Sequence, residues 1–415
     1  MVFAESGWQV TGLDIDAGKI ERLRQGRLHF HEPGLEELIS KHVQSGRLQF
    51  TTDKETAIAG HDVIFLCVGT PSRPDGSADL SYIQQASEDI GRAMNGYKLV
   101  VTKSTVPVGT QERIKSWMKA AQLQPCHFDV ASNPEFLREG KAVEDALRPD
   151  RIVIGTDSTR ATEQLQKLYR SFTCPWIVTN PRTAELIKYA SNSFLATKIS
   201  YMNELARLCD KLEVNVKEVA AGMGMDPRIG PSFLQAGLGY GGSCFPKDVS
   251  ELMITSRKHG VKLHILDQVA EINRMQFAYL LEKARLRLGG FENRNIAILG
   301  LAFKPDTDDI REAPAMRIID QLITEQAKVR LFDPVAALPV RPSYEAVTVC
   351  ASAEEALHGA EAIILCTEWS EFAQLDWEGA KALLAEPNFF DGRNMMDAER
   401  LREIGYYYQG IGSDY

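Results

Sequence analysis

Residues 184–212, AELIKYASNSFLATKISYMNELARLCDKL, decide the fold of this chain of 415 residues. Apolar side chains recur in this stretch at helical spacing, so it predicts a long and nearly uninterrupted helix. Further helical stretches follow to about Leu288. These helices separate two outer parts of the chain. The two outer parts share a sequence pattern that differs from that of the helices.

In both outer parts, short apolar or β-branched runs alternate with amphipathic helical stretches, which indicates βα units and parallel sheets. We therefore expect an α/β fold with two Rossmann-like parallel-sheet domains joined by a central helical domain. The expected domains are residues 1–181, 182–288 and 289–415. The runs before the helices are QVTGLDID, DVIFLCVG, LVVTKST, DVASNP and RIVIGT, and those after them are NIAILGL, KVRLFDP, EAIILCTE and FFDGRN.

The composition is that of an ordinary globular protein, with 44% hydrophobic residues and a net charge of −9. This acidic balance argues against a nucleic-acid partner. The seven cysteines lie far apart without a CxxC pair, so we expect a reducing compartment, no disulfide framework and no metal site. No apolar run approaches the ~20 residues of a membrane span, and the first residues do not resemble a signal peptide. We expect a cytoplasmic protein with no membrane partner.

The first βα unit of a dinucleotide-binding domain normally carries a glycine-rich turn, and an acidic residue ends its second strand. Here QVTGLDID matches the second strand, with Asp14 or Asp16 as the acidic residue. We expect the first strand and its loop to be absent, through start-site assignment, trimming or a natural cofactor-impaired form, which would leave unpaired edges and local instability. Gly237, Gly239 and Gly242 form a GxGxxG pattern, but no strand leads into it, so we do not expect NAD there.

The segment 237–248, GLGYGGSCFPKD, combines glycines with a cysteine, a lysine and a carboxylate. Glycines allow the backbone to approach a ligand closely. A Cys244 thiolate favoured by Lys247 could attack an aldehyde, with Asp248 beside them. The alternative is a structural cysteine in a tight loop.

Two further segments place polar side chains where chemistry is common. Lys188 and Asn192 stand four residues apart on the long helix, so an ammonium and an amide share one face and could stabilise an oxyanion; the alternative is a solvated face. Glu135 and Glu139 follow a strand end and a proline, a usual place for functional side chains, with ordinary surface charge as the alternative. Thr105 also follows a strand, where it could orient water or substrate, or cap the next helix.

In the C-terminal part, Lys304 in AFKPDTDD and Arg393 in DGRN are cations suited to a diphosphate. Solvated surface charges are the alternative for both. Cys67 lies inside an apolar strand, so we expect it to belong to the core.

The ordered blocks of the chain resemble those of the UDP-glucose/GDP-mannose dehydrogenase family, in particular its UDP-glucose 6-dehydrogenases. GYGGSCFPKD resembles the motif around that family's reactive cysteine. The other blocks are VTGLDID, HEPGLEEL, FLCVGTP, STVPVGT, SNPEFLREG, PDRIVIG, AELIKYASNSFLATKIS, GMDPRIGP, GLAFKPDTDDIREAP and FFDGRN. The resemblance implies oxidation of UDP-glucose to UDP-glucuronate with two NAD+, through a covalent intermediate on Cys244.

The resemblance also implies roles for single residues. Asp248, with Lys188 and a water, takes the proton from the C6 hydroxyl, and Asn192 supports the oxyanion. Glu135 is the acid/base of thioester hydrolysis, and Thr105 orients water or substrate. Implied NAD contacts are Asp14, Lys19, Thr70, Thr105, Glu139, Lys247 and Arg311. Implied substrate contacts are Glu135, Phe136, Leu137, Lys188, Asn192, Arg228, Phe233, Leu234, Gly237, Tyr240, Gly241, Lys304 and Arg393.

Arg228 resembles a residue that reaches a neighbouring subunit's site, so we expect a homodimer or a higher homo-oligomer formed through the central helices. Two other functions stay open. The substrate could be another nucleotide sugar, such as GDP-mannose or a UDP-N-acetyl sugar, because loop side chains decide that choice. The chain could also be a UDP-sugar binding protein that has lost catalysis together with the pyrophosphate loop.

Overall fold

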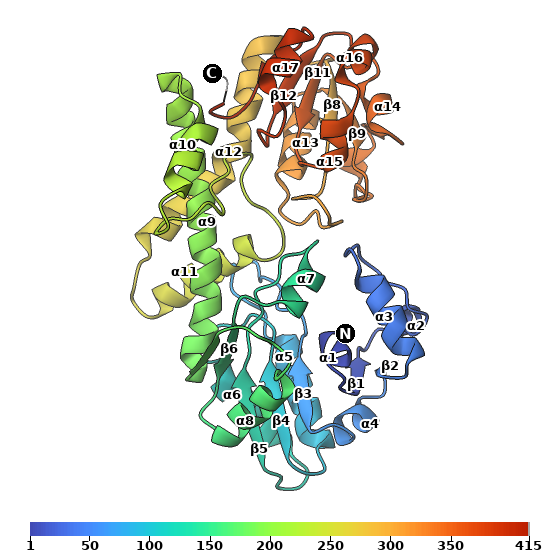
Figure 1. Ribbon diagram of the computed structural model, residues 1–415, viewed down its shortest axis with the longest axis vertical. Helices are drawn as coiled ribbons and strands as arrows, with labels where there is room; N and C mark the ends of the chain where they lie inside the picture. Colours follow the sequence, from blue (N-terminus) through green and yellow to red (C-terminus); the bar gives the residue numbers. More distant parts are fainter. Residues whose placement is uncertain (414–415) are drawn as a thin grey trace. The chain divides into compact units, whose positions relative to one another are not determined.

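The computed structural model describes residues 1–413 (Figure 1). The chain forms two compact units, each with its own core. The first contains Met1–Ser191 and Ser250–Val261, and the second contains Asn192–Val249 and the chain from Lys262 onward. Across residues 1–413, no helix combines the length and apolar character that a membrane span requires.

The strands of the first unit form two sheets. β1 (Val10–Leu13) pairs in parallel with β2 (Leu48–Thr51), and five further strands follow the order β3-β4-β5-β6-β7. These five are β3 (Val63–Leu66), β4 (Lys98–Thr102), β5 (Phe128–Ser132), β6 (Ile152–Gly155) and β7 (Trp176–Thr179). The helices are α1 (Val2–Glu5), α2 (Ala17–Arg24), α3 (Leu35–Gln44), α4 (Lys54–Ala59), α5 (Ser81–Ala93), α6 (Thr110–Ala121), α7 (Ala142–Leu147) and α8 (Thr159–Leu168).

Alternation along β4 explains how the five-stranded sheet is covered. Leu99 and Val101 pack in one apolar cluster with Leu165 of α8, whereas Val100 packs in another with Ile83 of α5 and Ile114 of α6. Successive strand residues point to opposite faces, so helices are needed on both. The expected sheet is parallel except for one pair. β5 and β6 run antiparallel and meet only at Ser132 and Gly155, which the run pattern could not reveal.

Cys67 differs from its prediction, because it is exposed rather than part of the core. It directly follows β3, and β3 is an edge strand of the five-stranded sheet. An apolar run therefore predicted the strand correctly, but it could not show that the strand lies at the edge.

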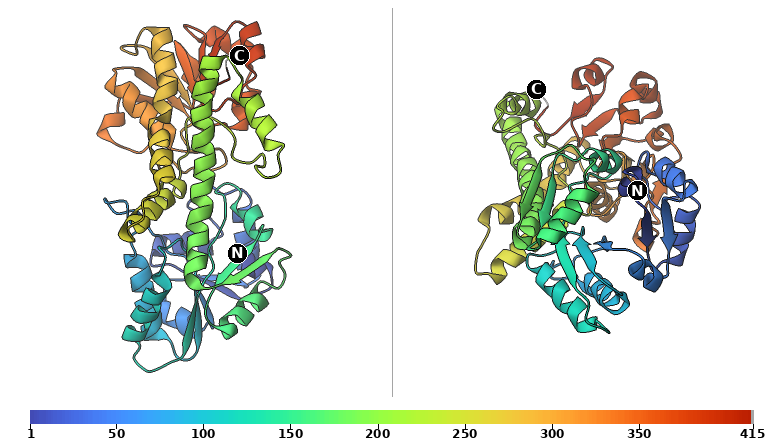
Figure 2. Two further views of the ribbon diagram at one scale, coloured as in Figure 1. Left: turned by 90° about the vertical axis from the view of Figure 1, so that its left-hand side faces the viewer. Right: turned by 60° about the horizontal axis from the view of Figure 1, so that its bottom comes forward.

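The central part of the chain is helical, as expected. Helix α9 (Pro181–Leu212) is 32 residues long and confirms the predicted helix (Figure 2). It is followed by α10 (Val216–Gly224), α11 (Phe245–Lys258) and α12 (His264–Leu288). The α9 residues Met202 and Ala206 pack with Leu280 and Leu281 of α12 in the core of the second unit.

The C-terminal part forms one six-stranded sheet in which every pair is parallel, in the order β10-β9-β8-β11-β12-β13. The fold class is therefore confirmed. Strand β11 is buried at all four positions, because helices cover both faces. The strands are β8 (Asn295–Leu299), β9 (Lys328–Phe332), β10 (Val347–Val349), β11 (Ala362–Leu365), β12 (Asn388–Asp391) and β13 (Tyr407–Gln409), and the helices are α13 (Pro314–Thr324), α14 (Ala353–Leu357), α15 (Ser370–Gln374), α16 (Trp377–Ala380) and α17 (Ala398–Glu403).

Candidate active site

An ion pair between Glu135 and Lys188 is the centre of the candidate residues in the first unit. The Lys188 Nζ lies 2.7 Å from Glu135 Oε1, and the lysine side chain is only 4% exposed. The other carboxylate oxygen of Glu135 accepts the Leu137 amide at 2.6 Å. Lys188 is thus buried and paired, which excludes the solvated helix face as an explanation.

Phe136 lies beside this ion pair. The Arg151 guanidinium stands 3.7 Å from the centre of the Phe136 ring, and the Lys188 Nζ stands 5.4 Å from it. Leu137 is exposed, and Glu139 is half-buried. The segment after β5 therefore joins an aromatic ring, a carboxylate and two cations, as expected for a polar ligand site with one apolar wall.

Lys103 also belongs to this region, although the sequence reading missed it. It directly follows β4, and its Nζ donates to Asn133 Oδ1 at 3.2 Å. Tyr169 donates its hydroxyl to the same oxygen at 2.5 Å. Burial lowers the pKa of Lys103 to about 8, and the charge of Glu135 opposes that shift. A lysine placed just after the apolar run Leu99–Val101 was the available signal.

A second polar group lies in the second unit. The Asn192 side-chain amide donates to Asp248 Oδ2 at 2.6 Å, and the Lys247 Nζ lies 2.6 Å from Asp248 Oδ1. The Asp248 side chain is 1% exposed, so both carboxylate oxygens have partners in a buried position. Asn192 is likewise buried, which excludes a solvated face for it as well.

Cys244 immediately precedes helix α11. The Asp248 amide donates to the Cys244 carbonyl at 2.9 Å and closes the first helical turn. The thiol is half-buried, and its Sγ lies 3.5 Å from Ser243 Oγ. The first turn of a helix presents unpaired N–H groups and a partial positive charge, so this position favours a thiolate.

The glycines before Cys244 lie close to other segments of the chain. Gly242 has φ of 79°, and a Cβ there would lie 2.7 Å from the Phe303 ring. A Cβ at Gly237 would lie 2.9 Å from the Gly392 carbonyl oxygen. Gly241 also packs closely, against the Glu312 carbonyl. The segment is therefore packed against the C-terminal domain.

The aromatic residues expected to enclose a substrate surround Phe245. The ring centres of Tyr240 and Phe233 lie 5.9 Å and 6.1 Å from that of Phe245. Leu234 and Tyr240 are buried, and burial raises the pKa of Tyr240. The sequence identified these residues through their resemblance to the family's loop. It did not predict that their rings would gather around Phe245, the first residue of α11.

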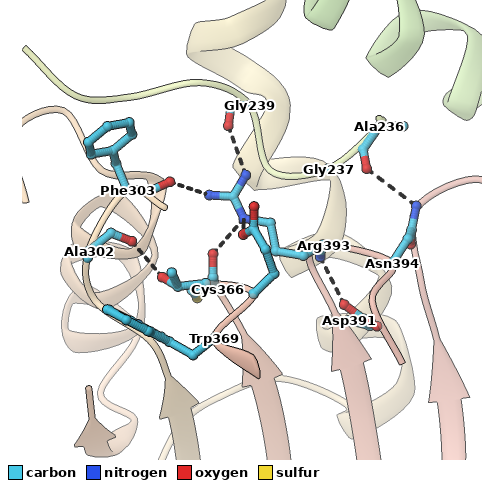
Figure 3. Close-up of polar contacts among 12 residues, drawn as sticks. Ala236, Gly237, Gly239, Ala302, Phe303, Cys366, Trp369, Asp391, Arg393 and Asn394 are labelled. Atoms are coloured by element: carbon cyan, nitrogen blue, oxygen red, sulfur yellow. Dashed lines mark hydrogen bonds and ion pairs between the residues drawn. The ribbon is translucent and has the colours of Figure 1, made fainter. Parts of the chain in front are cut away.

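The C-terminal candidates are Lys304 and Arg393. The Lys304 Nζ lies 5.3 Å from the centre of the Phe303 ring. The Arg393 side chain is only 12% exposed, and its guanidinium donates to backbone carbonyls from three segments (Figure 3). The sequence motifs around Cys244 and Arg393 could not predict these hydrogen bonds of Arg393, because the bonds join residues far apart in sequence.

Two pairs of the residues expected to bind NAD are in contact. Asp14 directly follows β1 and lies 3.8 Å from the Lys19 Nζ, with both side chains partly exposed. A carboxylate at this strand end fits the recognition of ribose hydroxyls. Thr70 donates its hydroxyl to the Thr105 carbonyl at 2.9 Å. Helix α6 begins at Thr110 after Gly109, so Thr105 is not its N-cap.

Two exposed arginines are paired with neighbouring carboxylates. Arg228, with a side chain 87% exposed, lies 2.6 Å from Asp226. Arg311 lies 2.8 Å from Asp309 and is 66% exposed. The candidate residues thus fall into separate groups, and α9 carries Lys188 of the first group and Asn192 of the second.

Comparison with known proteins gives the same family along the chain. Residues 1–173 match the NAD binding domain of the UDP-glucose/GDP-mannose dehydrogenase family, residues 182–275 its central domain and residues 297–398 its UDP binding domain. The chain is 44% identical to UDP-glucose 6-dehydrogenase YwqF of Bacillus subtilis, over 99% of this chain and 93% of that protein. It is 43% identical to a UDP-glucose 6-dehydrogenase of Pseudomonas aeruginosa, over 99% and 93%.

Solved structures agree. A UDP-glucose dehydrogenase from Pyrobaculum islandicum superposes with a TM-score of 0.91 at 40% identity, covering 99% of this chain and 94% of that one. A UDP-D-ManNAc dehydrogenase from Pyrococcus horikoshii gives 0.87 at 30% identity, covering 100% and 96%. The cofactor is accordingly NAD, and the chain is an oxidoreductase. By both sequence and structure, it belongs to the UDP-glucose/GDP-mannose dehydrogenase family.

Proposed function

We propose that this chain oxidises UDP-glucose to UDP-glucuronate with two NAD+, and that Cys244 holds the intermediate. The observation that carries the proposal is the position of Cys244 at the start of α11, within a chain 42–44% identical to several UDP-glucose 6-dehydrogenases. A nucleophilic thiol at the positive end of a helix suits the capture of an aldehyde. Capture would also keep a reactive intermediate from escaping.

NAD+, when bound, accepts a hydride in each of the two oxidations. Asp14 and Lys19 are proposed to hold its ribose, with Thr70 and Thr105 beside it. Glu139, Lys247 and Arg311 complete the proposed cofactor contacts. The remaining chemistry belongs to the chain's own side chains.

The first oxidation requires a proton acceptor for the C6 hydroxyl. We assign this to Asp248, acting with Lys188 and a water. Asp248 is buried, and its two carboxylate oxygens accept hydrogen bonds from the Asn192 amide and the Lys247 ammonium. As C6 loses a hydride and a proton, the alcohol becomes an aldehyde.

The thiolate of Cys244 then forms a C–S bond with the aldehyde carbon, and the carbonyl oxygen takes up a proton to give a thiohemiacetal. Loss of a second hydride and of that proton leaves a thioester. Water attacks the thioester, the C–S bond breaks, and the thiol and the carboxylate product are released. One cysteine can therefore serve a four-electron oxidation.

Glu135 is proposed to take the proton from the attacking water. Its ion pair with Lys188 holds the carboxylate in a fixed position, and a positioned carboxylate can accept a proton. Lys188 in turn offers its charge to the oxyanion that forms when water adds to the thioester. The proposed substrate contacts include Phe136, Phe233, Tyr240, Lys304 and Arg393.

The decisive experiment compares Cys244→Ser with the wild-type chain, using UDP-glucose and NAD+ and following NADH and UDP-glucuronate. We expect formation of the acid to fall at least a thousandfold. Cys67→Ser is the matched control, because it changes an exposed thiol and should leave the rate unchanged. Undiminished acid formation by Cys244→Ser would remove the covalent role.

A second candidate substrate is a UDP-N-acetyl sugar, because the chain is 30% identical to a UDP-D-ManNAc dehydrogenase. Competition between UDP-glucose, UDP-N-acetylmannosamine and GDP-mannose for turnover separates the candidates. We expect kcat/KM to be highest for UDP-glucose. A higher value for either other sugar would reassign the substrate.

We also propose a homodimer through α9. Phe194, Tyr201 and Leu208 follow at seven-residue intervals and are 64%, 49% and 51% exposed, so they form one apolar stripe. Light scattering after gel filtration should give a dimer for the wild-type chain and a monomer for Phe194→Glu. A monomeric wild-type chain would contradict this assembly.

A further inference from the structure

The segment 237–242 leads to Cys244, but it has no secondary structure of its own. Residues 225–244, all of which the structure describes, contain no helix or strand. Leu238 and Tyr240 are nevertheless buried. Buried main-chain N–H and C=O groups need hydrogen-bond partners, so the partners of this segment must come from other parts of the chain.

Side-chain amides of the two long helices hold the first residue of the segment. Asn203 of α9 accepts the Gly237 amide at 2.8 Å, and Gln276 of α12 donates to the Gly237 carbonyl at 2.9 Å. Both amide side chains belong to residues that are 0% exposed. The Gln276 oxygen accepts two N–H groups of Arg207, at 3.1 Å and 2.8 Å, which directs its amino group toward Gly237. Both main-chain groups of Gly237 are therefore held.

Asn273 holds the main chain of Tyr240 in the same way, but with a single side chain. Its Oδ1 accepts the Tyr240 amide at 2.8 Å, and its Nδ2 donates to the Tyr240 carbonyl at 2.9 Å. A residue of a neighbouring antiparallel strand would make the same two bonds with Tyr240. Asn273 and Gln276 stand three residues apart on α12, so one face of this helix serves both contacts.

Gly239 fits closely against Asn273. Its φ is 101°, and a Cβ at this position would lie 2.5 Å from Asn273 Oδ1. Glycine adopts this φ without strain, and it leaves the space that the asparagine oxygen occupies. Any side chain at position 239 would displace Asn273 from Tyr240, so the glycine and the asparagine depend on each other.

Two other bonds of the segment do not depend on side chains. The Leu238 amide donates to the Gly392 carbonyl at 2.9 Å, and the Gly242 amide donates to the Arg311 carbonyl at 2.8 Å. Main-chain carbonyls accept both bonds. The helix amides are therefore the part of this support that a substitution can remove.

We propose that Asn273 is a positioning residue for the substrate, because it fixes the main chain of Tyr240 within the segment 237–242. Asn203 and Gln276 support the same segment at Gly237. The consequence for substrate binding rests on the proposed function, in which Tyr240 contacts UDP-glucose. The way in which Asn273 holds the segment does not depend on that function.

The test compares Asn273→Ala and Asn273→Leu with the wild-type chain. Alanine removes both bonds to Tyr240, and leucine fills a similar space without hydrogen bonds. We expect amide exchange, followed by mass spectrometry, to speed up at least tenfold in peptides covering 237–244. Titration calorimetry without NAD+ should show an affinity for UDP-glucose at least tenfold weaker in both variants.

Steady-state kinetics separate positioning from a general loss of stability. We expect the KM for UDP-glucose to rise at least tenfold in Asn273→Ala, while the KM for NAD+ stays within threefold of wild type. A protein that is merely less stable has a smaller active fraction, which lowers kcat and leaves both KM values unchanged.

Asn388→Ala is the matched control. The buried Asn388 amide also uses both of its ends, since it donates to the Glu361 carbonyl at 2.8 Å and accepts Arg287 Nε at 3.0 Å. These contacts lie within the second unit but do not involve the segment 237–242. Asn388→Ala should lower the melting temperature, whereas exchange in 237–244 and the UDP-glucose affinity should stay within threefold of wild type.

Asn273→Asp is the variant to use if the alanine and leucine variants fold poorly. It keeps the size of the side chain and the acceptor for the Tyr240 amide, but an ionised carboxylate has no donor for the Tyr240 carbonyl. We expect its affinity for UDP-glucose to fall at least threefold. An affinity equal to that of wild type would contradict the proposal.

Unchanged exchange in 237–244 in both Asn273→Ala and Asn273→Leu would overturn the proposal. Faster exchange with an unchanged UDP-glucose affinity would also overturn it, as would an equal loss of affinity in Asn388→Ala. A wild-type chain that binds UDP-glucose but forms no NADH would instead refute the proposed oxidation. A tenfold weaker affinity in Asn273→Ala would then still support the positioning role.

Discussion

The sheets of the two α/β parts are held together differently. In the C-terminal domain six strands form one parallel sheet, and β8 has partners on both sides. In the first unit, all of which the structure describes, β1 pairs only with β2, and β3 is the edge strand of a separate sheet. Strand β11 is wholly buried, whereas Leu13 at the end of β1 is 43% exposed. The strand inside the continuous six-stranded sheet is therefore buried on both faces, whereas the strand of the two-stranded sheet is partly exposed.

Side chains connect the β1–β2 sheet to the rest of the first unit. The buried Glu32 accepts the amides of Gly140 and Ala142, each at 2.7 Å. Trp8 donates its indole N–H to the Leu168 carbonyl at 3.1 Å. A few separate contacts resist opening less cooperatively than a ladder does, so the two regions should differ in local stability.

The largest effect is expected from Ile364→Ala in β11. Ile364 is 0% exposed in the core of the second unit. Its truncation should lower the free energy of unfolding by about 3–5 kcal/mol. Ile64→Ala in β3 is the matched substitution, and it should cost less because Ile64 is only partly buried. Urea unfolding combined with hydrogen exchange of each sheet measures both. Equal costs would break the contrast between the sheets.

A smaller and local effect is expected from Glu32→Gln. The glutamine side chain would place its NH2 group, a donor, against one of the two backbone N–H donors. The loss of that hydrogen bond should lower the free energy of unfolding by about 1–3 kcal/mol. Exchange of the β1 and β2 amides should accelerate while β8 and β11 stay unchanged. Glu36→Gln is the control, because Glu36 accepts only a long 3.4 Å bond from Leu28. Unchanged exchange in β1 and β2 would mean that other contacts hold this sheet.

A pH-dependent effect is expected at Glu185, a buried residue of α9. Burial raises its pKa to about 7 from 4.5, although the Gly109 and Gln111 amides oppose the shift. Between these values the folded chain binds a proton that the unfolded chain does not, so stability falls as the pH rises from 4.5 to 7. Glu185→Gln should remove this pH dependence, which amounts to a change of about 1–3 kcal/mol in the free energy of unfolding across the interval.

Melting temperatures measured from pH 5 to 8 test the Glu185 prediction. Glu112→Gln is the control, since its hydrogen bond to Arg182 lowers the pKa of Glu112 and places its effect below pH 4.5. The charge of Glu112 also raises the pKa of Glu185, but less than burial does, so the Glu112 variant should keep most of the slope of the wild-type chain. A slope that persists in Glu185→Gln would assign the pH dependence to another group.

The smallest effect on stability is expected outside both sheets, at Arg228. Its side chain is almost fully exposed, so Arg228→Ala should leave the unfolding midpoint unchanged. If Arg228 reaches a partner's site, the variant should still lose turnover. Arg274→Ala is the control, an exposed arginine of α12 paired with Glu271, and it should change neither quantity. Full activity in Arg228→Ala would remove its proposed role.

Much of the fold could be predicted because the signals were local. The spacing of apolar residues predicted α9, and the alternating runs predicted nine of the thirteen strands within residues 1–413. The runs did not include β2, β7, β10 or β13. The segment around Cys244 was identified by its motif. The antiparallel β5–β6 pair, the exposure of Cys67 and the bonds of Arg393 to three backbone carbonyls were not predictable, since each depends on residues distant in sequence. The close packing of the glycines before Cys244 against distant segments was not predictable for the same reason.

Arg393 and Glu32 share a property that bears on how the chain tolerates change. Both recognise main-chain atoms, which every residue type possesses except that proline lacks the amide hydrogen. Positions 303 and 366, or 142, could therefore vary without losing these contacts, provided that the backbone conformation is unchanged. Position 140 is different, because Gly140 has a φ of 77° that favours glycine. Only the side chain of Arg393 is needed for its bonds to the carbonyls of residues 303 and 366, so saturation mutagenesis should find position 393 intolerant while positions 303 and 366 accept several replacements.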